Sequence, residues 1–377
     1  MNGHNHIFCI LPPHVLDRIV ENGSSEQQAN ARQTLQTTAD FRSQRLEQMA
    51  QPAAPREALA GALQRRVYTA NHGSSLPGQL VRSEGDPASS DVAVNEAYDG
   101  AGATYNLYWD VYQRNSIDNA GMIIDSTVHY QVGYENAFWD GQQMVYGDGD
   151  EDLPPSQRLF NRFTIAIDVI GHELTHGVTQ YTGKLVYSYQ SGALNESFSD
   201  VFGSLVKQRS LGQTAAQADW IIGEGLFTSN VNGVGIRSMK APGTAYDDPV
   251  LGKDPQPAHM DNYVNTTSDN GGVHINSGIP NHAFYLAAVE IGGNAWEKAG
   301  NIWYVTLRDR IQPTSNFQNA ADLTYAVAGD LYGIDSPEQQ AVAHGWAGVG
   351  ITIGGSTDGQ SPGCLGALAR LLGIKSQ

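Results

Sequence analysis

The sequence contains few cysteines, few basic residues and no long apolar run. Its two cysteines among 377 residues exclude a disulfide-rich scaffold. Lys and Arg total 22 against 39 Asp and Glu, and the formal net charge of -17 argues against nucleic acid as a partner. No apolar run approaches the roughly eighteen residues that a membrane-spanning helix needs, so no membrane span is expected.

Residues 1–13 lack the basic and apolar regions of a Sec signal, so we expect none. Extracellular export by a leaderless or dedicated route is the preferred interpretation, and a cytoplasmic location is the alternative. A composition with 40% hydrophobic and 16% charged residues argues against disorder. The chain is long enough for two lobes with sizeable cores, and no repeat of about 20–50 residues is visible.

The motif His172-Glu-Leu-Thr-His176 predicts a metal site. Residues four apart lie on one face of a helix, so both imidazoles can bind one ion. Glu173 lies about 100° further round the turn, where it is placed to take a proton from a metal-bound water. A chance match on a buried helix is the alternative, so the motif needs support from elsewhere in the sequence.

That support comes from a second stretch, Asn195-Glu-Ser-Phe-Ser-Asp200. A catalytic zinc takes three protein ligands and leaves the fourth position to water, and Glu196 is the predicted third ligand. Asp200 lies on the same helix face, where it is placed to accept the second N–H of a ligating imidazole and fix its tautomer. Asn195 is placed to do the same. On its own, Glu196 would be interpreted as a solvent-exposed carboxylate.

The sequence resembles the thermolysin family of zinc metallopeptidases. The resemblance spans roughly residues 67–352 and rests on six blocks: His172-Glu-Leu-Thr-His176, Asn195-Glu-Ser-Phe-Ser-Asp200, Asn136-Ala-Phe-Trp139-Asp-Gly, Met144-Val-Tyr-Gly-Asp-Gly-Asp150, Gly235-Ile-Arg237-Ser-Met and Asp269-Asn-Gly-Gly-Val-His274-Ile-Asn-Ser-Gly278. The leader containing Pro12-Pro13 is similar to that of the protealysin-type members, whose precursors carry a compact propeptide.

The resemblance implies an α+β, thermolysin-like two-lobe fold with the zinc helix between the lobes. Turn residues and short apolar runs predict a β-rich N-terminal lobe over residues 67–165, with one helix at 93–113. A helical period predicts a helical C-terminal lobe over 166–352. Its expected helices are the metal helix to about 181, then 192–209, 277–291, 296–310, 320–331 and 337–345.

The resemblance implies further site residues. Tyr187 and His274 are expected to stabilise the oxyanion of the tetrahedral intermediate, with His274 on a loop over the ion and Asp269 holding it cationic and oriented. Asn136 and the Ala137 carbonyl are expected on a strand edge that pairs with extended substrate. Arg237 is expected to contact the substrate carbonyl beyond the scissile bond.

The resemblance also assigns the pocket for the side chain after the cleaved bond. All of its wall positions are apolar: Phe160, Phe163, Val169, Ile222, Leu226 and Ile236. The expected cleavage is therefore on the amino side of Leu, Phe, Ile or Val.

Residues 1–52 are interpreted as a propeptide that acts as an intramolecular inhibitor. The Pro- and Ala-rich residues 53–66 suit a cleavable linker, with self-cleavage expected between 50 and 66. Three interpretations of Cys9 are open: a small packed apolar side chain, which leads, a thiolate that plugs the zinc, and a bridge to Cys364. The tail, residues 353–377, is expected to pack loosely on the surface.

The sequence departs from the family at its calcium sites. Asp168, Asp219 and Glu224 match family carboxylates, but Lys207 and Ile221 stand where the family has two further glutamates. Val234 replaces an aspartate of a second site. One ammonium facing three carboxylates balances charge that calcium would otherwise neutralise, so weak or absent calcium binding is expected.

The resulting prediction is a zinc-dependent endopeptidase with one catalytic Zn²⁺, made as a self-processing zymogen. It is expected to act as a monomer on protein and peptide substrates. An aminopeptidase is one alternative, although no acidic anchor for a free amine is found. A zinc-stabilised binding protein without turnover is another, but a purely structural site has no need of Glu173.

The pocket assignment makes a testable prediction. A hydrophobic pocket discriminates by about 1–3 kcal/mol per methylene, so peptides with Leu after the cleaved bond should have a higher kcat/KM than matched Asp peptides. A preference for Asp would contradict the assignment.

Overall fold

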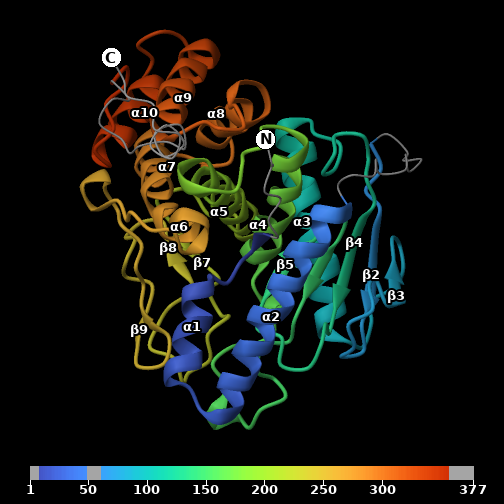
Figure 1. Cartoon of the computed structure of the whole chain (residues 1–377). Coiled ribbons are helices and arrows are strands. Elements are labelled where there is room, and N and C mark those ends of the chain that lie inside the picture. Colours follow the sequence, from blue (N-terminus) through green and yellow to red (C-terminus); the bar gives the residue numbers. More distant parts are fainter. Residues whose placement is uncertain (1–7, 49–60, 356–377) are drawn as a thin grey trace.

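The computed structural model describes residues 8–48 and 61–355 as two lobes with one long buried helix between them (Figure 1). The N-terminal lobe contains a six-stranded mixed sheet in the order β1-β5-β6-β4-β2-β3. The strands are β1 (Phe8–Cys9), β2 (Arg65–Thr69), β3 (Gln79–Ser83), β4 (Ile124–Val128), β5 (Ala137–Trp139) and β6 (Met144–Tyr146). Helix α3 (Val92–Tyr112) packs against this sheet.

The C-terminal lobe is mainly helical. Its helices are α5 (Tyr189–Leu211), α6 (Asp269–Asn276), α7 (Gly278–Ile291), α8 (Lys298–Val305), α9 (Phe317–Tyr332) and α10 (Pro337–Gly348). Two small hairpins pair β7 (Ile221–Ile222) with β8 (Arg237–Ser238), and β9 (Asp247–Asp248) with β10 (Gly252–Lys253). The predicted two-lobe α+β fold is confirmed.

Most predicted helices begin and end within a few residues of those observed. The segment predicted as one helix over 296–310 is an exception, because α8 is followed by a π-helical turn, Thr306–Arg310. The predicted linker also needs correction at its end. Arg65 and Arg66 pair with Ile124 and Asp125 in parallel strands, so these two residues belong to the sheet.

Helix α4 (Ile167–Tyr181) lies between the lobes and packs closely on α5. Its residues from Asp168 to Thr179 are all buried. Two glycines permit the close approach. A Cβ on Gly171 would lie 3.0 Å from the Cα of Gly203, and a Cβ on Gly203 would collide with the Asp168 carbonyl oxygen. The two glycines therefore bring the two stretches of predicted metal ligands together.

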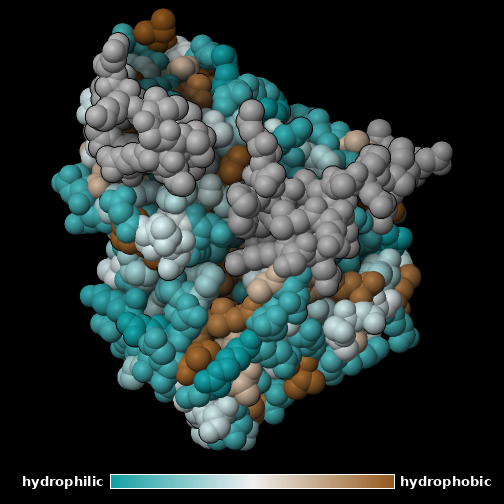
Figure 2. Space-filling view, in the orientation of Figure 1, coloured by the Kyte–Doolittle hydropathy of each residue, from teal (hydrophilic) through white to brown (hydrophobic). Residues whose placement is uncertain are grey.

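The N-terminal segment forms β1 and two helices, α1 (Pro13–Asn22) and α2 (Ser25–Gln48), which lie across the front of both lobes (Figure 1). Pro13 at the first helical position suits the start of α1, because proline has no N–H to leave unpaired there. Val15, Leu16 and Ile19 are buried in the same apolar core as residues of both lobes. On the face shown in Figure 2, hydrophilic side chains follow the outer surface of α2 and apolar ones lie beside it.

The ammonium of Lys207 lies among three carboxylates, as predicted. Its Nζ is 2.7 Å from Asp219, 2.9 Å from Glu224 and 3.7 Å from Asp168. Nζ also donates to the Ile221 carbonyl at 3.3 Å. Burial raises the pKa of Asp168 to about 6, although Lys207 and the Gly223 N–H act in the opposite direction. Lys207 therefore compensates a buried carboxyl group that would otherwise be costly to ionise.

The Lys207→Met variant should lower the free energy of unfolding by ~2–4 kcal/mol. This is less than a fully buried pair would lose, because Glu224 is mostly exposed. Lys298→Met is the matched control, since the ammonium of Lys298 is exposed and its ion pair with Glu338 should contribute little to stability. Denaturant titration compares the free energies of unfolding of the two variants, and equal small losses would contradict the role of Lys207.

A calcium-selective chelator should leave the Tm of the parent unchanged while zinc is kept saturated, and a large fall in Tm would contradict the substitution of Lys207 for calcium.

Candidate active site

Helices α4 and α5 bring the three predicted metal ligands together in a buried cluster. The Nε2 atoms of His172 and His176 are 2.9 Å apart. The carboxylate oxygens of Glu196 lie 3.5 Å from the first ring and 3.4 Å from the second. All three side chains are fully buried. Two imidazoles and one carboxylate thus converge on one point.

The outer nitrogen of each imidazole is held by the residues predicted for that role. His172 Nδ1 lies 2.8 Å from Asp200 Oδ1, and His176 Nδ1 lies 2.9 Å from Asn195 Oδ1. Each contact leaves Nε2 available to a metal ion. Ser199 also approaches His176 Nδ1 at 3.0 Å, a contact that was not predicted although Ser199 stands inside the recognised block.

Asp200 is fixed by groups from two further elements. Arg237 on β8 donates to both of its oxygens at 2.8 Å, and Asn281 on α7 donates to Oδ2 at 2.8 Å. Burial alone would raise the pKa of Asp200, but Arg237 and His172 outweigh it and hold the pKa at about 2. Asn281 has no sequence signal of its own, because its partner is distant along the chain.

These donors fit a zinc ion. Zinc prefers imidazole nitrogen and carboxylate oxygen, and three protein ligands are typical of its catalytic sites. Among the described residues, Glu196 Oε2 has no hydrogen-bond partner although it is buried. An unpaired carboxylate oxygen beside two ring nitrogens is costly without a cation. The site therefore has both the chemistry and the unmet charge that a divalent ion satisfies.

Glu173 lies beside the ligand cluster without belonging to it. Its Oε2 accepts the backbone N–H of Trp139 at 3.0 Å, while Oε1 has no hydrogen-bond partner among the described residues. Burial raises the pKa of this carboxyl group well above its usual range. One oxygen is thus anchored to the backbone of β5, whereas the other makes no such contact.

His274 and Tyr187 both lie against Glu196 of the ligand cluster. Tyr187 O–H donates to Glu196 and lies 3.1 Å from His274 Nε2, which is itself 3.6 Å from Glu196 Oε2. Asp269 lies 2.6 Å from His274 Nδ1 and also accepts the backbone N–H of His274 at 2.8 Å. Burial lowers the pKa of His274, but Asp269 and Glu196 together outweigh it, so the net shift is upward.

His274 does not lie on a loop, which corrects the prediction. It belongs to the helical end of α6, directly after three residues with left-handed backbone, Asn270, Gly271 and Gly272. The glycines make this turn accessible, since their positive φ values of 91° and 77° carry no Cβ penalty.

The polar groups predicted to bind the substrate backbone are occupied by the chain's own N-terminal segment. Strand β1 pairs antiparallel with β5, and Ile10 N–H donates to the Ala137 carbonyl at 3.3 Å. The Asn136 side chain accepts from Leu11 N–H at 3.0 Å and donates to its carbonyl at 3.3 Å. Hence β5 already has a strand partner along the edge that was predicted to bind substrate.

The same segment reaches the remaining polar groups. Arg237 donates to the Ile10 carbonyl at 2.9 Å, and His274 Nε2 lies 3.0 Å from the Cys9 carbonyl oxygen. Ile10 is fully buried in the apolar core cluster. That cluster also contains all six predicted pocket residues: Phe160, Phe163, Val169, Ile222, Leu226 and Ile236.

The Cys9 side chain is buried with aromatic residues rather than with the metal ligands. It belongs to a small apolar cluster with Tyr130, Tyr134, Phe138 and Val145. The group of candidate metal ligands at the predicted zinc site consists of His172, His176 and Glu196, without Cys9. The leading interpretation, a packed apolar side chain, agrees with this placement, and the thiolate plug does not. Cys364 lies outside the described residues.

Comparisons with known proteins agree with this geometry. The family model described as "Thermolysin metallopeptidase, catalytic domain" matches residues 22–180, and that of the alpha-helical domain matches residues 183–351. An extracellular metalloprotease of Pectobacterium carotovorum subsp. carotovorum is 50% identical over 348 residues, covering 92% of this chain and 97% of the relative. Protease PrtS of Photorhabdus sp. (strain Az29) is 47% identical over 355 residues, covering 93% and 94%.

A solved structure is also similar. The precursor of protealysin, a metalloproteinase from Serratia proteamaculans, is 50% identical, with a TM-score of 0.82. The match covers 92% of this chain and 100% of that one.

The two-lobe fold and the buried imidazole and carboxylate donors define a zinc metallopeptidase. The family models together match well over half of the chain. The chain belongs to the thermolysin family, and it is a zinc-dependent endopeptidase in precursor form.

If Tyr187 donates to the developing oxyanion, as the family resemblance implies, Tyr187→Phe should lower kcat by about 10²–10³-fold. Tyr112→Phe is the matched control, since its buried hydroxyl donates to the Trp296 carbonyl outside the site. Steady-state peptide hydrolysis by the mature forms measures both. A comparable loss in the two variants would point to a general structural effect instead.

Proposed function

We propose that Glu173, His274 and Tyr187 carry out peptide hydrolysis at this site and that the N-terminal segment inhibits it. The observation that carries the proposal is the path of Cys9, Ile10 and Leu11. Their backbone engages β5, Arg237 and His274 as an extended substrate would. A segment in that position excludes other peptides from the edge.

The ligands for Zn²⁺ are His172, His176 and Glu196. When bound, the ion supplies Lewis-acid chemistry, polarising the scissile carbonyl and lowering the pKa of water. Glu173 accepts a proton from the attacking water at the oxygen that has no hydrogen-bond partner, and later donates this proton to the leaving amine. His274 and Tyr187 donate hydrogen bonds to the oxyanion that develops.

The remaining residues hold the substrate backbone during these steps. The Ala137 carbonyl accepts the N–H on the leaving side of the cleaved bond. Arg237 donates to the carbonyl of the substrate residue that follows the cleaved bond, and Asn136 binds the backbone of the next substrate residue. Asp269 keeps His274 protonated and oriented through Nδ1. The six apolar residues assigned to the pocket by the family resemblance, which belong to the same buried cluster as Ile10, would favour substrates with a large apolar residue after the cleaved bond.

The Glu173→Ala variant tests the proposed general base. Casein hydrolysis should be detectable with the parent, abolished by chelator, and reduced by several orders of magnitude in the variant at equal zinc content. On incubation the parent should shorten at its N-terminus while the variant stays full length. Equal shortening of the parent and the variant would contradict self-processing, and equal casein hydrolysis by the two would contradict the role of Glu173.

The cleavage that releases the N-terminal segment is proposed to fall between residue 50 and Arg65, because Arg65 is the first residue of β2. Part of this stretch lies outside the described residues.

The relatives include a protein named as extracellular. We therefore propose an extracellular location for this enzyme. We also propose that it acts as a monomer. None of the described helices is long and apolar enough to cross a membrane.

His14 on α1 makes docking of the N-terminal segment sensitive to acid. Its Nε2 lies 3.2 Å from Tyr246 O–H, and its buried Nδ1 has no hydrogen-bond partner among the described residues. Burial lowers the pKa of His14 from 6.5 to about 4. Asp269 opposes the shift, while His274, Arg237 and Arg18 add to it.

Because the docked pKa is depressed, docking is favoured above pH 6.5 and weakens as the pH falls toward 4, by roughly 300-fold in total. Amide exchange protection of α1 in the Glu173→Ala chain should therefore fall between pH 7 and pH 5. Adding His14→Gln should flatten this dependence, whereas adding His344→Gln, an exposed histidine paired with Glu290, should leave it unchanged. An unaltered profile with His14→Gln would refute this role.

A further inference from the structure

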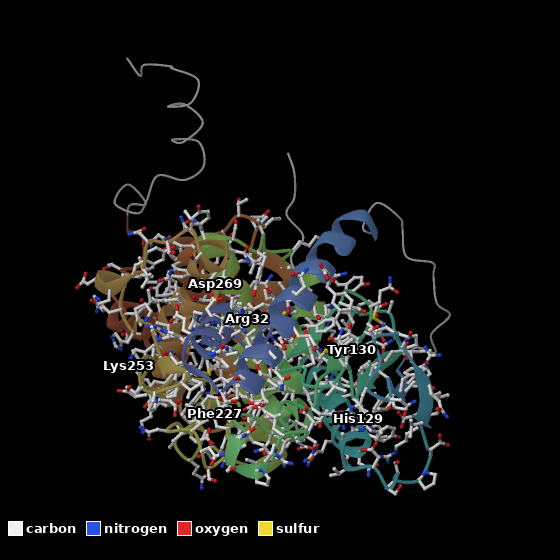
Figure 3. All side chains as sticks on the ribbon, turned by 60° about the horizontal axis from the view of Figure 1, so that its bottom comes forward. Arg32, His129, Tyr130, Phe227, Lys253 and Asp269 are labelled. Atoms are coloured by element: carbon white, nitrogen blue, oxygen red, sulfur yellow. The ribbon has the colours of Figure 1, made fainter. Side chains whose placement is uncertain are left out.

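A second group of metal-binding side chains lies in the N-terminal lobe. It consists of His72, His129 and Asp148, whose ligand atoms all lie within 4.8 Å of one another. His129 Nδ1 is 2.8 Å from Asp148 Oδ2, and His72 Nδ1 is 3.4 Å from the same oxygen. Figure 3 shows His129 well away from Asp269, so this group is separate from the active site.

The sheet brings the three residues together. Strands β2, β4 and β6 are parallel neighbours, and each of the three residues follows the end of one of them. His72 N–H also donates to the His129 carbonyl at 2.8 Å, which ties the two chain segments to each other. The group is therefore held by backbone structure and does not depend on flexible side chains alone.

The backbone conformation of both histidines is unusual. His72 has a φ of 61° and His129 a φ of 55°, in the left-handed region that residues other than glycine seldom adopt. Such conformations persist where the surrounding structure over-determines them, and they cluster at functional sites. Here the left-handed turns set the two imidazoles beside Asp148, with the ring centroids 5.4 Å apart.

The spacing of the ligand atoms is similar to that of the predicted zinc ligands in the active site. There the ligand atoms are separated by 2.9–3.5 Å, and in this group by 2.8 and 3.4 Å for the contacts to Asp148. His129 Nε2 lies 2.8 Å from Asp91 Oδ2, just as His172 Nδ1 is held by Asp200. A carboxylate behind a ligating imidazole is a recurrent feature of metal sites.

Asp91 is itself anchored. It caps the N-terminus of α3, where its Oδ1 accepts the N–H of Ala93 at 3.0 Å, so its other oxygen faces His129 in a fixed orientation. The site differs from the catalytic one in exposure. The His72 side chain is 56% exposed and that of Asp148 15%, so an ion can enter from solvent and retain water ligands.

We propose that His72, His129 and Asp148 form a second binding site for a divalent transition-metal ion of the Zn²⁺ class, with Asp91 orienting His129. Two imidazoles and one carboxylate favour zinc over the oxygen-preferring Ca²⁺ and Mg²⁺. A bound ion joins the ends of three parallel strands and so stabilises the sheet on which the substrate-binding strand β5 lies. This inference does not depend on the proposed roles of the catalytic residues.

The test is a Zn²⁺ titration of the full chain carrying Glu173→Ala, which prevents self-cleavage. With a competing chromophoric chelator, the parent should bind two equivalents, the second more weakly than the first. Adding His72→Ala should remove the second equivalent and keep the first, because His72 is exposed and its loss should not disturb folding. His344→Ala, which removes another exposed histidine beside a carboxylate, should still bind two.

Asp91→Asn separates metal binding from a merely structural role. Asparagine caps a helix about as well as aspartate, so α3 should be preserved. The affinity of the second equivalent should fall by about 10–100-fold, because the charge behind His129 is lost. The Tm of the parent, but not of His72→Ala, should rise when Zn²⁺ exceeds one equivalent. One equivalent in the parent, or loss of the second equivalent in His344→Ala, would overturn the proposal.

Discussion

The close packing of α4 on α5 is the constraint on which the rest of the active site depends. His172 and His176 come from one helix and Glu196 from the other, so the distance between the helices sets the distance between the ligands. Gly171 and Gly203 allow this distance because neither places a Cβ at the contact. A larger side chain at either position would separate the carboxylate from the imidazoles before it altered any ligand.

Around this contact the protein buries an unusual amount of charge. Asp200, Glu196, Glu173 and Arg237 are all buried, and each costs free energy unless it is paired. Asp200 meets that cost through three partners, whereas Glu173 and Glu196 each retain one oxygen without a hydrogen bond among the described residues. These two oxygens belong to the residues proposed as the general base and as the third zinc ligand, so their lack of partners agrees with the proposed roles.

Much of the active site was predictable from sequence, because its ligands lie at helical spacing in short recognisable blocks. The spacing of His172 and His176 predicts a shared face on any α-helix. The pairing of β1 with β5 was not predictable in the same way. Phe8 and Cys9 form a strand of only two residues, too short for any period to show. Asn281 was missed because tertiary packing, and not local sequence, places it beside Asp200.

The predicted and observed boundaries of some segments differ, and these differences also have a physical cause. Arg65 and Arg66 look like linker residues in sequence, yet they pair with β4 because the sheet supplies backbone partners that composition does not reveal. The glycines before His274 predict a loop, but in the structure they form one tight turn that leads directly into a helix. Glycine-rich stretches therefore mark a change of direction, but they do not determine whether the next residues form a loop or a helix.

The most direct test is anomalous diffraction at the zinc absorption edge from crystals of the full-length Glu173→Ala chain. We expect an anomalous peak between His172 Nε2, His176 Nε2 and a carboxylate oxygen of Glu196. The backbone of residues 9–11 should run along β5 beside this peak. Absence of zinc from that position, or a Glu196 carboxylate turned away from the two imidazoles, would contradict the account.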